Sequence, residues 1–262
     1  PMVHMLIAGF IGLTPIAAAP VPPRLSAPVE VDGERLAVPT PEQAEWQDME
    51  LGMFIHFAPQ TWQNSERDDL STPLADMNPG KLDTNQWVDV AASMGAKYIV
   101  FVAKHEGGFC WWQTDTTDFS VKNTPWRGGK GDVLKDLAAS CKTRDIKLGV
   151  YLSPQDRKHG AGVGGKTNDP ADQSAYEKLF REQLTEVLSR YGEMVEVWFD
   201  GNLVFDVGDV LAAHTPRAMI FQGPQATIRW VGNEEGVVPE NAWNTVRSGA
   251  KEWGHYKAPD GD

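Results

Sequence analysis

The stretch Val195-Glu196-Val197-Trp198-Phe199-Asp200-Gly201 decides the fold, because this short apolar run ends in a carboxylate followed by glycine. Such runs are typical of buried parallel strands. In a (β/α)₈ barrel, the residues just beyond the carboxyl end of a strand face the active site. Asp200 is therefore a candidate for chemistry, although an Asp-Gly pair can also serve only to turn the chain.

Similar apolar runs and helical patterns alternate on both sides of this stretch. Strict alternation of strand and helix favours a parallel sheet that either closes into a barrel or is doubly wound. No G-x-G-x-x-G follows the first strand, which weakens a dinucleotide-binding fold. The predicted fold class is α/β, a (β/α)₈-like TIM barrel, incomplete at the C-terminus because we find five strands where closure needs eight. We expect the other strands at 53–57, 98–103, 148–152 and 218–221, and helices at 84–95 with Thr84 as N-cap, at 132–144 and at 172–191.

The composition limits the classes of partner. The chain has 262 residues, of which 41% are hydrophobic, and this is enough to build one large domain. Its net charge of −12 would repel nucleic acid and anionic membranes, so we expect neither as a partner.

The N-terminal residues have the features of a targeting segment. An apolar run at 6–13 precedes Ala17-Ala18-Ala19, an A-x-A cleavage pattern, and the run is too short to span a bilayer. We therefore expect a signal peptide at 1–19, a proline-rich linker at 20–41 and the catalytic barrel at 42–262, with the C-terminal part of the barrel missing. The expected location is secreted or periplasmic.

Polar residues follow the expected strand ends, and a barrel would collect them on its catalytic face. Histidines with carboxylates can bind zinc, but the local H-x-x-x-H spacing of many zinc sites is missing. Glycoside hydrolysis instead needs two carboxylates across the scissile bond, with no metal or cofactor. The second carboxylate could be Glu234, Glu235 or Glu240, in the loop beyond the fifth strand. The residues at the strand ends are His56, His105, Glu106, Asp156, Asp200 and Gln222.

Four motifs in order make the chain resemble the alpha-L-fucosidases of glycoside hydrolase family 29, from about Trp46 to Tyr256. The resemblance implies a (β/α)₈-like barrel, usually followed by a β-sandwich. It also implies a fucosylated glycan as substrate and a mechanism that retains the anomeric configuration. The motifs are Leu51-Gly52-Met53-Phe54-Ile55-His56-Phe57, Ala103-Lys104-His105 continuing to Gly108-Phe109-Cys110-Trp111-Trp112, Gly149-Val150-Tyr151-Leu152-Ser153-Pro154, and Val197-Trp198-Phe199-Asp200-Gly201.

The resemblance also implies roles for single residues. Asp200 matches the catalytic nucleophile, and Glu234 best matches the acid/base residue. Glu240 remains a contender, because the spacing from Asp200 to Glu234 is short. The loop at 229–234 resembles the branch of the family that cleaves α-1,3 and α-1,4 fucosyl linkages of Lewis-type glycans. The expected sugar-binding residues are His56, Glu66, His105, Trp112 and Trp230.

Three departures from the family pattern fall close to the expected site. The common His-His-Asp-Gly sequence appears here as His105-Glu106-Gly107-Gly108, Arg67 stands where a tryptophan often follows the glutamate, and Gln155 replaces the tryptophan after Ser-Pro. Hydroxyl contacts tune binding, whereas the carboxylate pair cleaves the bond, so each departure could change affinity without abolishing hydrolysis. The first alternative function is a sugar-binding homologue without catalysis, and the second is a metal-dependent hydrolase.

Overall fold

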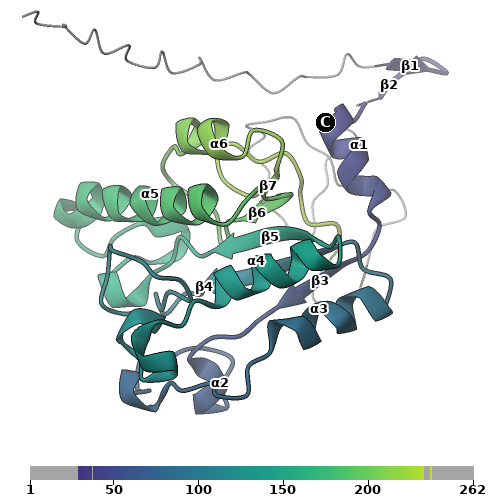
Figure 1. Cartoon of the computed structure of the whole chain (residues 1–262). Helices are drawn as coiled ribbons and strands as arrows, with labels where there is room; N and C mark the ends of the chain where they lie inside the picture. Colours follow the sequence, from purple (N-terminus) through teal and green to yellow (C-terminus); the bar gives the residue numbers. More distant parts are fainter. Residues whose placement is uncertain (1–28, 37, 233–236, 238–262) are drawn as a thin grey trace, which may run out of the picture.

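Five parallel strands form the central sheet of the computed structural model, which describes residues 29–36, 38–232 and 237 (Figure 1). Their order across the sheet is their order along the chain, and every neighbouring pair is parallel. The predicted alternation is confirmed, and this sheet with its helices forms part of a (β/α)₈-like barrel. The strands are β3 (Gly52–Ile55), β4 (Tyr98–Lys104), β5 (Lys147–Leu152), β6 (Glu196–Trp198) and β7 (Met219–Phe221).

Helices connect the strands and cover the outer face of the sheet (Figure 1). Asp83, not the expected Thr84, caps the first of the three predicted helices, because its carboxylate accepts a hydrogen bond from the Asn85 backbone N–H. The Thr84 hydroxyl instead shares a hydrogen bond with Ser140 on the neighbouring helix. The α-helices are α1 (Pro41–Asp48), α2 (Gln60–Gln63), α3 (Thr84–Ser93), α4 (Val133–Thr143), α5 (Gln173–Arg190) and α6 (Gly208–His214). The 3₁₀ helices are η1 (Leu74–Asp76), η2 (Val121–Asn123), η3 (Trp126–Gly129), η4 (Arg157–His159), η5 (Val163–Gly165) and η6 (Pro170–Asp172).

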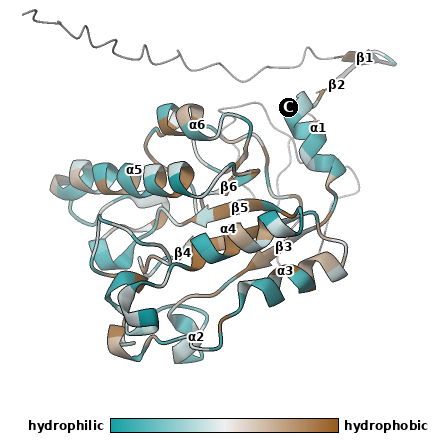
Figure 2. Ribbon diagram, viewed as in Figure 1, coloured by the Kyte–Doolittle hydropathy of each residue, from teal (hydrophilic) through white to brown (hydrophobic). Residues whose placement is uncertain are grey.

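Alternate residues of each strand serve the two faces of the sheet. On β4, Ile99 and Phe101 belong to the large core shared with the helices, whereas Val100 and Val102 belong to a separate inner cluster. Figure 2 shows the result, with apolar strands and helices that are apolar toward the sheet and polar toward solvent. The inner face also holds aromatic rings, among them Tyr151.

A short hairpin lies within 20–41, the segment expected to be a linker. Its strands, β1 (Val29–Val31) and β2 (Glu34–Leu36), pair antiparallel. Asp32 and Gly33 connect them with positive φ angles of 54° and 83°, which fits the type I′ turn that Asp-Gly favours.

A buried carboxylate, that of Glu196, lies on the inner face of the sheet near α1. Glu196, the first residue of β6, is 2% exposed, and its Oε2 accepts a hydrogen bond of 2.9 Å from the Trp46 indole N–H. Burial raises the pKa of Glu196 to about 7, although the hydrogen bond from Trp46 opposes this. Trp46 thus connects α1 to the barrel.

Candidate active site

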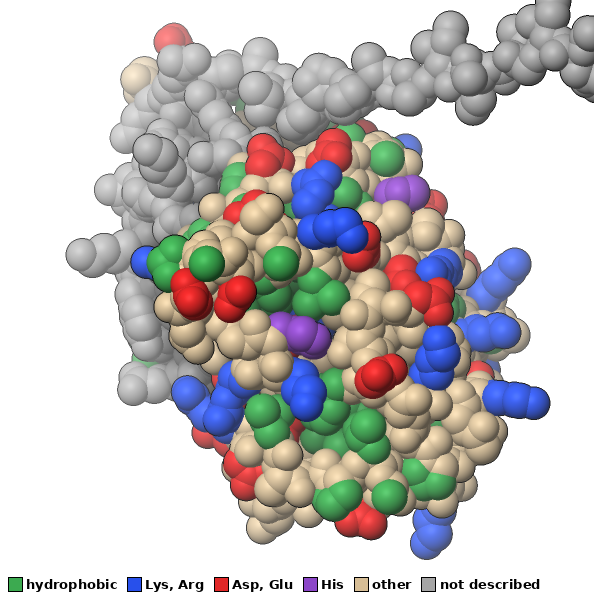
Figure 3. Space-filling model, turned by 90° about the vertical axis from the view of Figure 1, so that its left-hand side faces the viewer, with side chains coloured by type: hydrophobic (Ala, Val, Ile, Leu, Met, Phe, Trp, Pro, Cys, Tyr) green, Lys and Arg blue, Asp and Glu red, His purple; other side chains and the backbone are tan. Residues whose placement is uncertain are grey.

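The carboxyl ends of β3, β4 and β6 carry three of the residues that the sequence singled out. His56 follows β3, His105 follows β4, and Asp200 stands two residues beyond β6. Figure 3 shows the face toward which the β5 arrow points in Figure 1. A histidine lies near its middle, with acidic and basic side chains around it.

Tyr151, near the end of β5, connects these three residues. Its hydroxyl donates a hydrogen bond of 2.8 Å to Asp200 Oδ2. Its ring stacks on His105 with the centroids 5.7 Å apart, and it meets His56 edge-on at 5.9 Å. The two imidazoles meet edge-on at 5.1 Å. Two histidines, a phenol and a carboxylate therefore form one cluster.

The environment fixes the protonation of this cluster. Burial and then the charge of Asp200 raise the pKa of Tyr151 far above its usual range, so Tyr151 stays protonated and donates a hydrogen bond to Asp200. Burial, together with the charge of His105, lowers the pKa of His56. Burial also lowers the pKa of His105, by more than the carboxylates of Asp200 and Asp68 raise it. Near pH 7 both imidazoles are neutral, and each offers one donor and one acceptor to a ligand.

A buried ion pair supports the cluster from behind. Lys104, the residue before His105, places its Nζ 3.1 Å from Asp156 Oδ2, and both side chains are completely buried. Lys104 also donates to Gln183 of α5 at 2.8 Å, and His159 lies 2.9 Å from the other Asp156 oxygen. Burial alone would raise the pKa of Asp156, but the charge of Lys104 and the contacts with His159 outweigh it, so this pKa lies below its usual range.

The residues after Asp156 tie three loops of the catalytic face together. The Arg157 guanidinium donates to the backbone oxygen of Asp68, in the loop after β3. The backbone N–H of Arg157 donates to Glu106 O at 2.8 Å, and that of Lys158 donates to Gly107 O at 3.3 Å, both in the loop after β4. These contacts hold the loops after β3, β4 and β5 in one arrangement.

The packing around Gly107 explains why a glycine stands at this departure from the family sequence. A Cβ atom at Gly107 would lie 2.1 Å from Asp68 Oδ2, so no side chain fits there while Asp68 is in place. Asp68 is 1% exposed, and its other oxygen accepts from Gln63 and from the Leu70 backbone N–H, both at 2.8 Å. Asp68 therefore occupies the space that a residue at 107 would otherwise fill.

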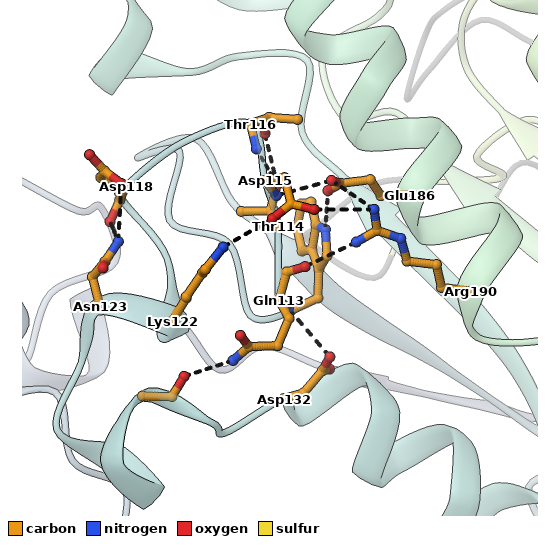
Figure 4. A network of polar contacts seen from close by, with 12 residues as sticks. Gln113, Thr114, Asp115, Thr116, Asp118, Lys122, Asn123, Asp132, Glu186 and Arg190 are labelled. Carbon is orange, nitrogen blue, oxygen red and sulfur yellow. Dashed lines mark hydrogen bonds and ion pairs between the residues drawn. The ribbon is translucent and has the colours of Figure 1, made fainter.

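Trp112, expected to bind sugar, lies elsewhere. It is 0% exposed, and its indole N–H donates a hydrogen bond of 2.8 Å to Glu186 Oε2 on α5. Figure 4 shows the surrounding network, in which Glu186 also accepts from the Asp115 backbone at 3.0 Å and from Arg190 at 3.1 Å. A buried indole needs such a partner, so Trp112 connects the loop after β4 to α5 and has no surface to offer a ligand.

The remaining expected residues take different positions. Glu66 is exposed, near enough for its charge to act on His105. Trp230 packs edge-on against Trp198, with the centroids 5.9 Å apart, on the aromatic inner face. Glu234 and Glu240, the two candidates for the acid/base role, lie outside the described residues.

Within residues 29–36, 38–232 and 237, no three His, Cys, Asp or Glu side chains gather in a group that could hold a metal ion. The same residues contain no helix with the length and apolar character needed to cross a bilayer.

Comparisons with known proteins point to one family. A family model described as Alpha-L-fucosidase matches residues 69–259. The chain is similar to alpha-L-fucosidase 1 of Arabidopsis thaliana, with 36% identity over 227 residues that cover 82% of this chain and 43% of the relative. The chain thus spans less than half the length of this curated relative.

Solved structures show the same similarity. A glycoside hydrolase 29 family member from an unknown rumen bacterium aligns with a TM-score of 0.70 at 37% identity, over 78% of this chain and 40% of its own. A GH29 fucosidase of Ruminococcus gnavus in complex with fucose aligns with a TM-score of 0.67 at 27% identity, over 83% and 49% of the two chains.

Proposed function

The chain belongs to the alpha-L-fucosidase family, glycoside hydrolase family 29, and on this basis we propose that the protein removes terminal L-fucose from oligosaccharides or glycoconjugates. The cluster around Tyr151 carries the proposal. It brings a carboxylate and two neutral histidines together at the carboxyl ends of neighbouring strands. The relative from Ruminococcus gnavus, solved in complex with fucose, supports fucose as the sugar.

The proposed mechanism is a double displacement with retention of configuration. Asp200 attacks the anomeric carbon, and the leaving oxygen takes a proton from an acid on the other side of the bond. The Tyr151 hydroxyl holds Asp200 Oδ2, so the rotation of the carboxylate is fixed and Oδ1 can be directed at carbon. Water then cleaves the fucosyl ester, with the same acid now acting as base.

Glu234 is the proposed acid/base residue, with Glu240 as the contender. A retaining pair holds its carboxyl groups about 5 to 5.5 Å apart. The match of the loop at 229–234 to the family branch favours Glu234.

His56 and His105 are the proposed contacts for the hydroxyl groups of fucose. Neutral imidazoles can both donate and accept, as a ring with several hydroxyl groups requires. Glu66, exposed beside them, and Trp230 are the other proposed contacts with the substrate.

The proposed linkage is α-1,3 or α-1,4 in Lewis-type glycans, from the same resemblance of the loop at 229–234. Such a loop would use the second branch of the glycan to position the bond, so binding energy should appear in the rate. Lewis-type trisaccharides should then have a much higher kcat/KM than aryl fucosides. Equal values of kcat/KM would reject this specificity.

Rescue by azide tests the mechanism. Asp200→Gly removes the nucleophile and leaves space for a small anion, so azide should restore turnover and give a fucosyl azide of inverted configuration. Glu234→Ala should still react with activated aryl fucosides and should give, with azide, a product of retained configuration.

Loss of activity on the natural substrate in Glu240→Ala but not in Glu234→Ala would assign the acid/base role to Glu240. Full activity of Asp200→Gly without azide would reject the mechanism, and binding of fucosides without any turnover by the native chain would indicate a sugar-binding homologue.

We also propose export from the cytoplasm through a signal peptide at 1–19. The apolar run and the alanines at 17–19 support this. The chain is expressed with an added initiator methionine, and the N-terminus of the exported protein is sequenced. Cleavage should be found near residue 20. Retention of the whole segment on protein in the cytoplasm would reject the signal peptide.

A further inference from the structure

Gln60 reaches the catalytic cluster although no motif includes it. It is the first residue of α2 and is 8% exposed. Its backbone oxygen accepts from the N–H groups of Asn64 and Ser65, which fixes the start of its side chain. Because the residue is 8% exposed, the packing around the side chain limits where it places its amide.

The amide contacts one nitrogen of His105. Gln60 Nε2 lies 3.1 Å from His105 Nδ1, and the described residues include no other hydrogen-bond partner for this amide. In the structure the amide is oriented with Nε2 toward Nδ1 and with Oε1 left without a partner in the described part of the chain. An N–H₂ group can donate but cannot accept, so in this orientation Nδ1 supplies a lone pair. A neutral imidazole that accepts at Nδ1 carries its proton on Nε2.

The surroundings leave Nε2 as the ring nitrogen for a ligand. Tyr151 stacks on the His105 ring with an angle of 28° between the planes, and His56 meets the ring edge-on. The charged and titratable groups that act on His105 come from two loops. They are Glu66, Arg67 and Asp68 after β3, Asp200 after β6, and His56 after β3.

We propose that Gln60 is a positioning residue that holds His105 in the tautomer with the proton on Nε2. His105 then presents a hydrogen-bond donor to an oxygen of the ligand. Only the identity of this ligand, a hydroxyl group of the sugar, rests on the proposed function. Gln60 itself does not touch the substrate.

Nitrogen NMR of the chain with ¹⁵N-labelled histidine tests the tautomer directly. His105→Phe identifies the His105 signals among those of six histidines. The native chain at pH 7.5 should show a protonated Nε2 and an unprotonated Nδ1. In Gln60→Glu the carboxylate can only accept, so the proton should move to Nδ1 or both nitrogens should be protonated. Gln60→Met keeps the length without the amide and should give a mixture of the tautomers.

Gln63→Met is the matched control. Gln63 lies on the same short helix, but its amide contacts Asp68 and Thr72 and not His105. This variant should keep the native tautomer. A protonated Nδ1 in the native chain would overturn the proposal even if no variant folds, and so would an unchanged tautomer in a folded Gln60→Glu or Gln60→Met.

Kinetics separate this inference from the proposed function. Loss of one neutral hydrogen bond to the sugar should raise KM of Gln60→Met by up to about tenfold, with a smaller change in kcat. A tautomer change in a chain that binds and cleaves no fucoside would support the role of Gln60 and reject the function. Fucoside hydrolysis without a tautomer change would do the reverse.

Discussion

Replacement of Lys104 by methionine should destabilise the protein strongly, although lysine and methionine side chains are of similar length. Lys104 and Asp156 form an ion pair without exposure to solvent, 3.1 Å apart. Methionine would leave the Asp156 carboxylate buried with only His159 and backbone contacts to balance its charge. The carboxylate packs closely against Gly108, where an added Cβ atom would lie 2.2 Å from Asp156 Oδ1.

The expected loss is about 3 to 5 kcal/mol of unfolding free energy, the range for removing one partner of a buried pair. Asp156→Asn should have a similar effect, because it leaves the Lys104 ammonium unpaired. The double variant Lys104→Met with Asp156→Asn buries no net charge, so its loss should be clearly smaller than the sum of the single losses. Lys178→Met provides the control. It breaks a pair with Glu182 whose side chains are 75% and 50% exposed, and it should change stability by less than about 1 kcal/mol.

Urea unfolding followed by far-ultraviolet circular dichroism at pH 7 gives these free energies. The sign of the pH effect also follows. The folded pKa of Asp156 is depressed, so the contribution of the pair is present above about pH 4, the usual aspartate pKa, and is lost as pH falls through the folded value. A loss below about 1 kcal/mol for Lys104→Met, or single losses that add up in the double variant, would refute the reasoning.

Three other variants test single contacts. Tyr151→Phe removes the donor to Asp200 Oδ2 and should lower kcat/KM for an aryl fucoside by about 10- to 100-fold, the equivalent of one hydrogen bond to a charged group. Tyr191→Phe loses a similar hydrogen bond, to Asp132, and should keep the native kcat/KM. Equal effects of the two variants would contradict a role of Tyr151 at the site. Glu196→Gln should raise the free energy of unfolding by about 3 kcal/mol over the native chain at pH 8 and by almost nothing at pH 4. The reason is that a carboxyl group with a folded pKa of about 7 destabilises the native protein as pH rises from about 4.5 to 7. The same difference in urea midpoint between variant and native chain at both pH values would disprove this. Gly107→Ala should lower the thermal midpoint because its methyl group meets Asp68, whereas Gly80→Ala, with open space around it, should not, and a stable Gly107→Ala would show that Asp68 is free to move.

The sheet was predictable because buried strands are continuous apolar runs. All five strands were located from this signal and the three expected helices from their helical periodicity, with the ends within a few residues. The hairpin at 29–36 was missed although Asp32-Gly33 between strand-like residues is a recognised signal, because the prolines around it favoured a linker.

The site was predictable only in part. Strand ends identify which loops meet, so His56, His105 and Asp200 follow from position alone. Trp112 could not be placed, because a loop has no period that tells which side chain turns inward, and its partner Glu186 lies 74 residues further on. Tyr151 had a signal, since alternation along β5 sets it on the inner face. Gln60 had none, because its contact depends on how α2 turns.

The sheet order has a consequence for how the chain acquires its structure. Strands that pair in the five-stranded sheet follow one another in the chain, so each parallel pair closes through one local connection that contains at least one helix. Loop-closure entropy is modest for such neighbours. During synthesis from the N-terminus, β4 can pair with β3 as soon as it emerges, and each later strand then finds its partner already formed. Assembly in the direction of translation should therefore meet few wrong pairings.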